Sequence, residues 1–127
     1  MAVTSTCVRP IGIIDDDDGV RDSLRDLLES FGYEVRDFPG AVEFLESPSA
    51  EPGCLILDMH MPRMNGLELV EVLRGRGDRT PVIMLSANTA DLKRHPAAGN
   101  VLHILSKPVS DTELLGWIET ALTSSQP

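Results

Sequence analysis

The chain has 127 residues, about the length of a single domain. Its formal net charge of -9 and sequence pI near 4.6 disfavour binding to nucleic acid or to anionic membranes, because both need a basic surface. Cys7 and Cys54 cannot form a disulfide framework, and they lack metal-ligand spacing with each other or with the histidines. No apolar run approaches the ~20 residues of a membrane span. We therefore expect a protein of the reducing cytoplasm that is not bound to a membrane.

Short apolar runs alternate with helical patterns along the chain. Five runs are too short for helices and rich in β-branched residues, and they predict strands at residues 11–14, 35–38, 54–57, 82–85 and 101–105. A first helix is predicted after the first run, with Gly32 as its stop. Its apolar residues at helical spacing are Val20, Leu24, Leu27, Leu28 and Phe31.

Further helical patterns follow the later strands. Their apolar residues are Ala41, Phe44 and Leu45 in the second, Leu67, Val70 and Leu73 in the third, and Leu114, Leu115, Ile118, Ala121 and Leu122 in the last. Asn65 is placed to cap the third helix, and Ser110 or Asp111 the last. Between the fourth and fifth runs, Pro96 and Gly99 interrupt the pattern. A fourth helix is therefore expected to be short or irregular.

The alternation of strands and helices predicts a doubly wound α/β fold, with one parallel sheet and helices on both faces. The common order for five such units is the flavodoxin-like 2-1-3-4-5. Its switch point lies between the first and third strands, at their carboxyl ends, and a ligand is expected there.

Polar residues stand at the ends of four predicted strands. Four consecutive aspartates, Asp15 to Asp18, follow the first, Asp58 ends the third, Ser86 ends the fourth, and Lys107 comes just after the fifth. Several carboxylates with one lysine leave excess negative charge, which a magnesium ion would offset. Such a site suits phosphoryl chemistry, with Asp58 as nucleophile and aspartyl phosphate as product.

Four motifs together resemble the receiver domains of bacterial two-component response regulators. They are Asp15-Asp16 after an apolar strand, Asp58-Met59-His60-Met61-Pro62 with Asn65-Gly66 following, Leu85-Ser86-Ala87, and Lys107-Pro108. The segments 20–24 and 32–35 are most similar to receivers of nitrogen-fixation-type regulators. The resemblance implies a receiver domain at residues 9–122, an amino-terminal tail at 1–8 and a carboxyl-terminal tail at 123–127.

The resemblance also implies a role for each matching residue. Asp58 would accept a phosphoryl group from a phosphohistidine on a sensor histidine kinase or a histidine phosphotransfer protein. Asp15, Asp16, Asp58 and the backbone carbonyl of His60 would hold Mg²⁺. Ser86 would be the switch hydroxyl, and Lys107 would form an ion pair with the phosphoryl group. The peptide bond between Lys107 and Pro108 would be cis. Asp17, Ala87 and Pro108 would be accessory. The chain would be a signalling domain rather than an enzyme acting on a separate substrate.

Asp18 is expected only to favour the dipole of the helix that follows. Two positions depart from the family pattern. Ile104 stands where many receivers have a tyrosine or phenylalanine that changes rotamer, and Pro96 and Gly99 interrupt the fourth helix.

Three other functions remain open from the sequence. The departures motivate a degenerate receiver that binds partners without phosphorylation. A haloacid-dehalogenase-type phosphohydrolase uses similar groups, but its motif needs a second aspartate where this chain has His60. A flavin carrier on the same fold is disfavoured, because the aspartate cluster would repel the flavin phosphate.

Overall fold

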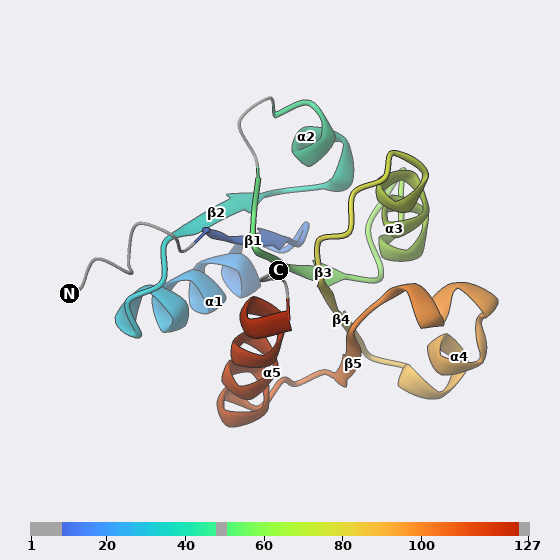
Figure 1. Cartoon of the computed structure of the whole chain (residues 1–127). Helices are drawn as coiled ribbons and strands as arrows, with labels where there is room; N and C mark the ends of the chain where they lie inside the picture. Colours follow the sequence, from blue (N-terminus) through green and yellow to red (C-terminus); the bar gives the residue numbers. More distant parts are fainter. Residues whose placement is uncertain (1–8, 48–50, 125–127) are drawn as a thin grey trace.

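Five parallel strands form the centre of the protein, and helices cover both faces of the sheet (Figure 1). The computed structural model describes residues 9–47 and 51–124. The strands are β1 (Ile11–Ile14), β2 (Val35–Phe38), β3 (Cys54–Asp58), β4 (Val82–Ser86) and β5 (His103–Ser106). The helices are α1 (Asp18–Ser30), α2 (Ala41–Leu45), α3 (Gly66–Gly75), α4 (Thr89–Arg94), the 3-10 helix η2 (Pro96–Asn100) and α5 (Asp111–Ser124).

The strand order is β2-β1-β3-β4-β5, which confirms the predicted topology. Every residue of β1, β3 and β4 is buried, because these strands are covered on both faces. The register pairs Ile14 with Leu57 and Asp58 with Leu85, so the carboxyl ends of the central strands lie at one edge of the sheet. The polar residues that end these strands are brought together there.

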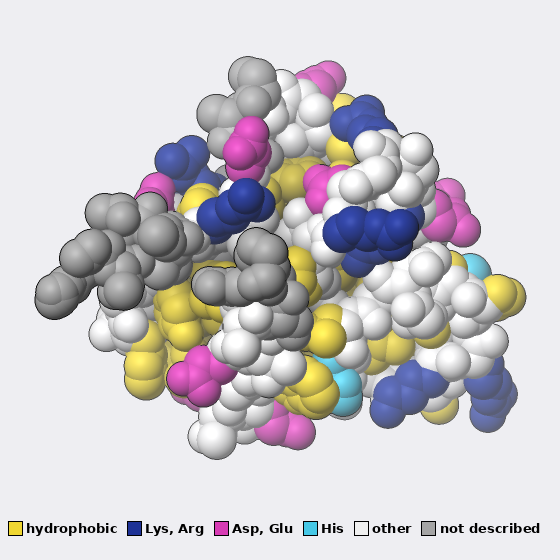
Figure 2. Space-filling model, in the orientation of Figure 1, with side chains coloured by type: hydrophobic (Ala, Val, Ile, Leu, Met, Phe, Trp, Pro, Cys, Tyr) yellow, Lys and Arg dark blue, Asp and Glu magenta, His cyan; other side chains and the backbone are white. Residues whose placement is uncertain are grey.

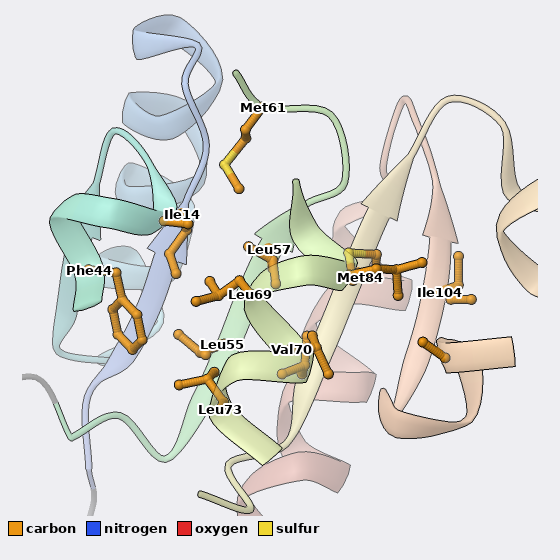
Figure 3. Close-up of a cluster of buried hydrophobic side chains, with 14 of the residues drawn as sticks. Ile14, Phe44, Leu55, Leu57, Met61, Leu69, Val70, Leu73, Met84 and Ile104 are labelled. Atoms are coloured by element: carbon orange, nitrogen blue, oxygen red, sulfur yellow. The ribbon is translucent and has the colours of Figure 1, made fainter. Parts of the chain in front are cut away.

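Two hydrophobic clusters lie on opposite faces of the sheet. Ile14, Leu57 and Met84 point into the cluster covered by α2, α3, α4 and η2 (Figure 3). Ile13, Ile56 and other alternate strand residues belong to the second cluster, beneath α1 and α5. Successive strand residues face opposite sides, so short and almost wholly apolar strands supply both cores.

Local capping explains where the helices begin. Asn65 accepts the backbone N–H of Glu68 at 2.9 Å, and the Glu68 carboxylate accepts the backbone N–H of Asn65 at 2.8 Å, forming a capping box that confirms the predicted cap of α3. The Glu113 backbone N–H donates to the Ser110 hydroxyl at 3.4 Å at the start of α5. The expectation that Phe31 belongs to the apolar face of α1 is wrong. The helix ends at Ser30, and Phe31 is 61% exposed because the chain turns away at Gly32, which has a φ of 89°.

The fourth helix is short, as predicted. α4 ends at Arg94, and His95 has the extended backbone that a residue before proline favours. The His95 Nδ1 atom accepts the backbone N–H of Ala97 at 3.0 Å and begins η2. Because η2 continues to Asn100, β5 starts at His103, two residues later than predicted.

The predicted chain ends fall partly outside the described part of the chain. α5 continues to Ser124, so Thr123 and Ser124 of the predicted carboxyl-terminal tail are helical. Residues 125–127, the predicted tail at 1–8 and Cys7 within it lie outside the described residues. Cys54 is a free thiol, and burial raises its pKa to about 12, so it is a poor nucleophile. Within residues 9–47 and 51–124, no helix has both the length and the apolar character needed to cross a membrane.

Candidate functional site

Three aspartates converge at the carboxyl edge of the sheet. Asp15 directly follows β1 and Asp58 ends β3, and both are buried, whereas Asp16 is exposed. One carboxylate oxygen from each of the three lies within 4.8 Å of the others. Three like charges this close repel one another unless a cation lies among them. The predicted carboxylate group is therefore present, and its donor atoms are those that Mg²⁺ prefers.

Lys107 provides a positive charge beside this cluster. Its Nζ atom lies 3.0 Å from Asp58 Oδ1 and 3.7 Å from Asp15 Oδ2. The backbone N–H of Lys107 donates to the carbonyl of Ser86 at 3.0 Å, and the bond from Lys107 to Pro108 is cis, as the resemblance implied. Burial of Lys107 lowers its pKa, but the hydrogen bond to Asp58 and the charges of Asp58, Asp15 and Asp16 outweigh this effect and raise the pKa above its ordinary value. Lys107 is thus protonated at neutral pH.

One carboxylate oxygen of Asp15 accepts a hydrogen bond, whereas the other accepts none from the described residues. Its Oδ1 atom accepts the backbone N–H of Asp17 at 2.9 Å, whereas its buried Oδ2 atom has no hydrogen-bond partner. Burial raises the pKa of Asp15, Asp58 and Asp16 raise it further, and the Asp17 N–H and Lys107 oppose the rise. A buried carboxylate oxygen that accepts no hydrogen bond from the described residues and lies beside two more carboxylates fits a bound divalent cation.

Arg21 anchors the acidic loop from the side of α1. Its guanidinium group donates to the backbone carbonyl of Asp15 at 2.8 Å and contacts the carboxylates of Asp18 at 2.6 Å and Asp37 at 3.2 Å. Sequence reasoning did not assign this residue. The i,i+3 spacing of Asp18 and Arg21 is the signal that pointed to part of the network, whereas the contact with Asp37 depends on the pairing of β1 with β2.

Ser86 is buried at the end of β4, close to the start of α4. Its hydroxyl oxygen accepts the backbone N–H of Asn88 at 3.0 Å. The Asn88 side chain in turn caps α4, accepting the Asp91 backbone N–H at 3.3 Å. Asn88 was not predicted as part of the site. Its position before a short helix, where asparagine is a common cap, was the available signal.

The remaining predicted positions surround these groups. Asp17 is the N-cap of α1 and accepts the Val20 backbone N–H at 3.1 Å. Asp17 therefore stabilises the start of this helix together with Asp18, which lies in its first turn. The backbone N–H of His60 lies 3.4 Å from Asp58 Oδ1. Ala87 and Pro108 are exposed next to Ser86 and Lys107. Ile104 is buried in the same hydrophobic cluster as Leu92 and Ala97, where it acts as a packing residue.

A parallel α/β sheet with clustered carboxylates and a paired lysine at its switch point defines a class of magnesium-dependent phosphoryl-handling domains. A family model described as the response regulator receiver domain matches residues 11–119, and the chain belongs to this family. It is a signalling module of two-component systems.

Relatives and solved structures agree with this assignment. The transcriptional regulatory protein TdiR of Thauera aromatica is 37% identical over 87% of this chain and 49% of its own length. FixJ of Bradyrhizobium diazoefficiens is 32% identical over 92% of this chain and 58% of its own length. The solved structure of full-length FixJ from B. japonicum has 31% identity and a TM-score of 0.85, covering 94% of this chain and 60% of that one. The chain thus spans about half the length of the curated relatives it matches. These findings favour the receiver function over the phosphohydrolase, flavin and degenerate-receiver alternatives.

Proposed function

We propose that Asp58 accepts a phosphoryl group from a phosphohistidine of a sensor histidine kinase or a histidine phosphotransfer protein. The observation that carries the proposal is the position of the Asp58 carboxylate, which lies 3.0 Å from Lys107 Nζ and within 4.8 Å of carboxylate oxygens of Asp15 and Asp16. The Asp58 carboxylate therefore lies beside the positive charge of Lys107 and beside a position where a second cation, Mg²⁺, would bind. Mg²⁺ would be held by Asp15, Asp16, Asp58 and the backbone carbonyl of His60.

The proposed transfer uses an oxygen atom of Asp58 as the nucleophile. This oxygen attacks the phosphorus atom, the new P–O bond forms as the P–N bond breaks, and the donor imidazole leaves and takes up a proton. A bound Mg²⁺ would neutralise negative charge on the phosphoryl oxygens. Lys107 would contact one of these oxygens, and the Ser86 hydroxyl, whose hydrogen has no acceptor among the described residues, would donate to another.

The proposal extends to the domain boundaries and to the reaction itself. A single receiver domain of residues 9–122 would catalyse only its own phosphorylation and dephosphorylation. A cytoplasmic location suits this role, because a sensor kinase presents its phosphohistidine to a receiver there. Ala87 and Pro108 border Ser86 and Lys107, and we assign them accessory roles.

Intact-mass measurement tests the proposal directly. After incubation with acetyl phosphate and Mg²⁺, the protein should gain the mass of one phosphoryl group. Asp58→Asn should abolish the gain, whereas Asp26→Asn, a change of the same kind at an exposed position on α1, should retain it. The proposal is contradicted if neither acetyl phosphate nor a cognate kinase produces an adduct that depends on Asp58.

The same measurement also tests the alternative that the chain is a binding module that acts without phosphorylation. That function has one observation in its favour, because the buried Ile104 stands where an aromatic switch residue is common and α4 has six residues. A protein that folds, binds Mg²⁺ and never gains a phosphoryl group would establish it. A stoichiometric adduct on Asp58 would exclude it.

A further inference from the structure

A second charged site lies at the opposite end of the sheet. A pocket of about 540 Å³ is lined by residues that precede strands β1, β3, β4 and β5, among them Arg9, Gly53, Pro81 and Leu102. In a parallel sheet the strands start at one edge and end at the other, so the pocket and Asp58 lie at opposite edges. The pocket therefore belongs to a different surface from the phosphoacceptor site.

Three arginines line this pocket in a chain that is otherwise strongly acidic. They are Arg9, Arg74 and Arg79, and the single acidic residue in the lining is Asp78. The Asp78 carboxylate is already engaged, since its Oδ1 atom accepts the Thr80 backbone N–H at 2.9 Å and the Thr80 hydroxyl at 2.6 Å. Figure 2 shows Lys and Arg side chains on this face over α3 and the loop that follows it. Three guanidinium groups and one carboxylate leave two positive charges in the pocket.

Within residues 9–47 and 51–124, none of the three guanidinium groups forms an ion pair with a carboxylate. Among the described residues, ion pairs join carboxylates to Arg21, Arg25, Arg36, Arg63, Arg94 and Lys107, and none reaches Arg9, Arg74 or Arg79. Arg74 instead donates to the backbone carbonyls of Asp78 at 2.9 Å and Asn100 at 2.8 Å. These bonds hold its planar group in the wall of the pocket. Burial lowers the pKa of Arg74 and the charge of Arg79 lowers it further, and together they outweigh the opposing charge of Asp78.

We propose that this pocket binds a small organic molecule that carries a phosphate group. Guanidinium groups match the geometry of phosphate oxygens, and a dianion matches the two uncompensated charges better than a monoanion does. The pocket is also lined by Pro52, Pro81, Val101 and Leu102, which would contact an apolar part of the ligand. The site is large enough for a ligand of nucleotide size.

Titration of the full chain with phenyl phosphate, followed by backbone amide shifts in NMR, tests this inference. EDTA is present throughout, so that the uncompensated carboxylates around Asp58 repel the anion. We expect saturable shifts at Arg79, Thr80 and Asn100, weaker binding of inorganic phosphate, and weaker binding of benzoate. Benzoate binding as tight as phenyl phosphate would overturn the phosphate assignment, and the absence of saturable shifts with all three anions would overturn the site.

Matched arginine variants separate the pocket from a general effect of charge. Arg79 makes no side-chain hydrogen bond within the described part of the chain, so Arg79→Gln should leave the fold intact while weakening phenyl phosphate binding by about tenfold, the loss of one charge-assisted hydrogen bond. Arg76→Gln removes the same charge from a residue on the same connection that does not line the pocket, and it should change affinity by less than about twofold. Equal weakening by both variants would show non-specific attraction and would overturn the proposal. Unfolding curves for both variants establish that each remains folded.

Discussion

The buried hydroxyl oxygen of Ser86 accepts the backbone N–H of Asn88 at 3.0 Å, and this contact links the end of β4 to the cap of α4. Asn88 uses its side chain to accept the Asp91 N–H and to donate to the Asp91 carboxylate at 2.9 Å. If Ser86 turns towards a phosphoryl group on Asp58, the Asn88 N–H loses its acceptor. A change at the phosphoacceptor would thus reach α4 without an aromatic side chain at Ile104.

Substitution Ser86→Ala tests this link. The Asn88 N–H would lose its partner, and we expect the free energy of unfolding to fall by about 1 kcal/mol. Amide hydrogen exchange at Asn88 and Asp91 should become faster, because the cap of α4 is loosened. Ser106→Ala is the control, since Ser106 is exposed opposite Ser86 in the register of β5. Unchanged exchange at both amides in Ser86→Ala would contradict the link.

Two glycines of α3 should respond in opposite ways to alanine. A Cβ atom at Gly66 would lie 2.7 Å from Met84 Sδ and 2.9 Å from the carbonyl oxygen of Asp58, whereas one at Gly75 would meet nothing within 4 Å. Gly66→Ala should therefore lower the free energy of unfolding by about 2 kcal/mol through overpacking. Gly75→Ala should raise it by up to about 1 kcal/mol, because it reduces the freedom of the unfolded chain.

Urea unfolding measures both variants. Gly66→Ala should also slow phosphorylation by acetyl phosphate, since the displaced atoms include the backbone of the phosphoacceptor itself. Equal stability of the two variants would show that α3 moves away from β3 without cost, contrary to this prediction.

The acidic cluster should oppose folding at neutral pH when Mg²⁺ is absent. The pKa of Asp15 in the folded protein is raised above its ordinary value, first by burial. Its contribution to stability is therefore present at pH values below the unfolded pKa of 3.8 and is lost as pH rises through the folded pKa. At pH 7 and in EDTA, Asp15→Asn should raise Tm by about 4 °C, which corresponds to about 1 kcal/mol in a domain of this size.

Mg²⁺ should reverse the order of these stabilities. It should raise the Tm of the unmodified protein and have much less effect on Asp15→Asn, because that variant has lost a ligand oxygen. Asp26→Asn, at an exposed position, should respond to Mg²⁺ like the unmodified protein. A full Mg²⁺ response in Asp15→Asn would remove Asp15 from the proposed ligand set. Differential scanning fluorimetry provides the measurement.

His103 and Trp117 form a stacked pair whose fluorescence should depend on pH. Their ring centroids lie 3.8 Å apart with an interplanar angle of 15°, and Trp117 is the single tryptophan of the chain. Burial and then the charge of Lys93 lower the pKa of His103 below 6.5, although Glu113 opposes this shift. Stability from the neutral imidazole is thus present above the unfolded pKa and is lost as pH falls through the folded pKa.

We expect Trp117 emission to fall as His103 gains its proton, with a midpoint below pH 6.5. His103→Gln should abolish this step, whereas His60→Gln, at an exposed position in the loop after β3, should preserve it. A midpoint above 6.5 would mean that Glu113 dominates over burial and Lys93.

Local features were predictable from the sequence because they depend on neighbouring residues. The strand of residues 11–14, the capping role of Asn65 and the short fourth helix follow from periodicity, capping and the backbone limits of proline. Phe31 was placed wrongly because the helical pattern does not show where the helix stops making contact with the core. β5 begins later than predicted because Val101 is the C-cap of η2 and its backbone N–H donates to the carbonyl of Ala98 at 3.3 Å.

The residue types and strand ends of the candidate site were thus determined by the sequence, but the distances were decided by the tertiary structure. Asp58 and Lys107 are 49 positions apart, and the sheet register brings their side chains to 3.0 Å. Local sequence patterns could not predict the contact of Arg21 with Asp37, or that Arg9 lines one pocket with Arg74 and Arg79. Both depend on the sheet, which brings together segments that are distant along the chain. The chemical type of each site residue can be read from the sequence, whereas the distances between these residues depend on the parallel strands, whose carboxyl ends lie at one edge of the sheet.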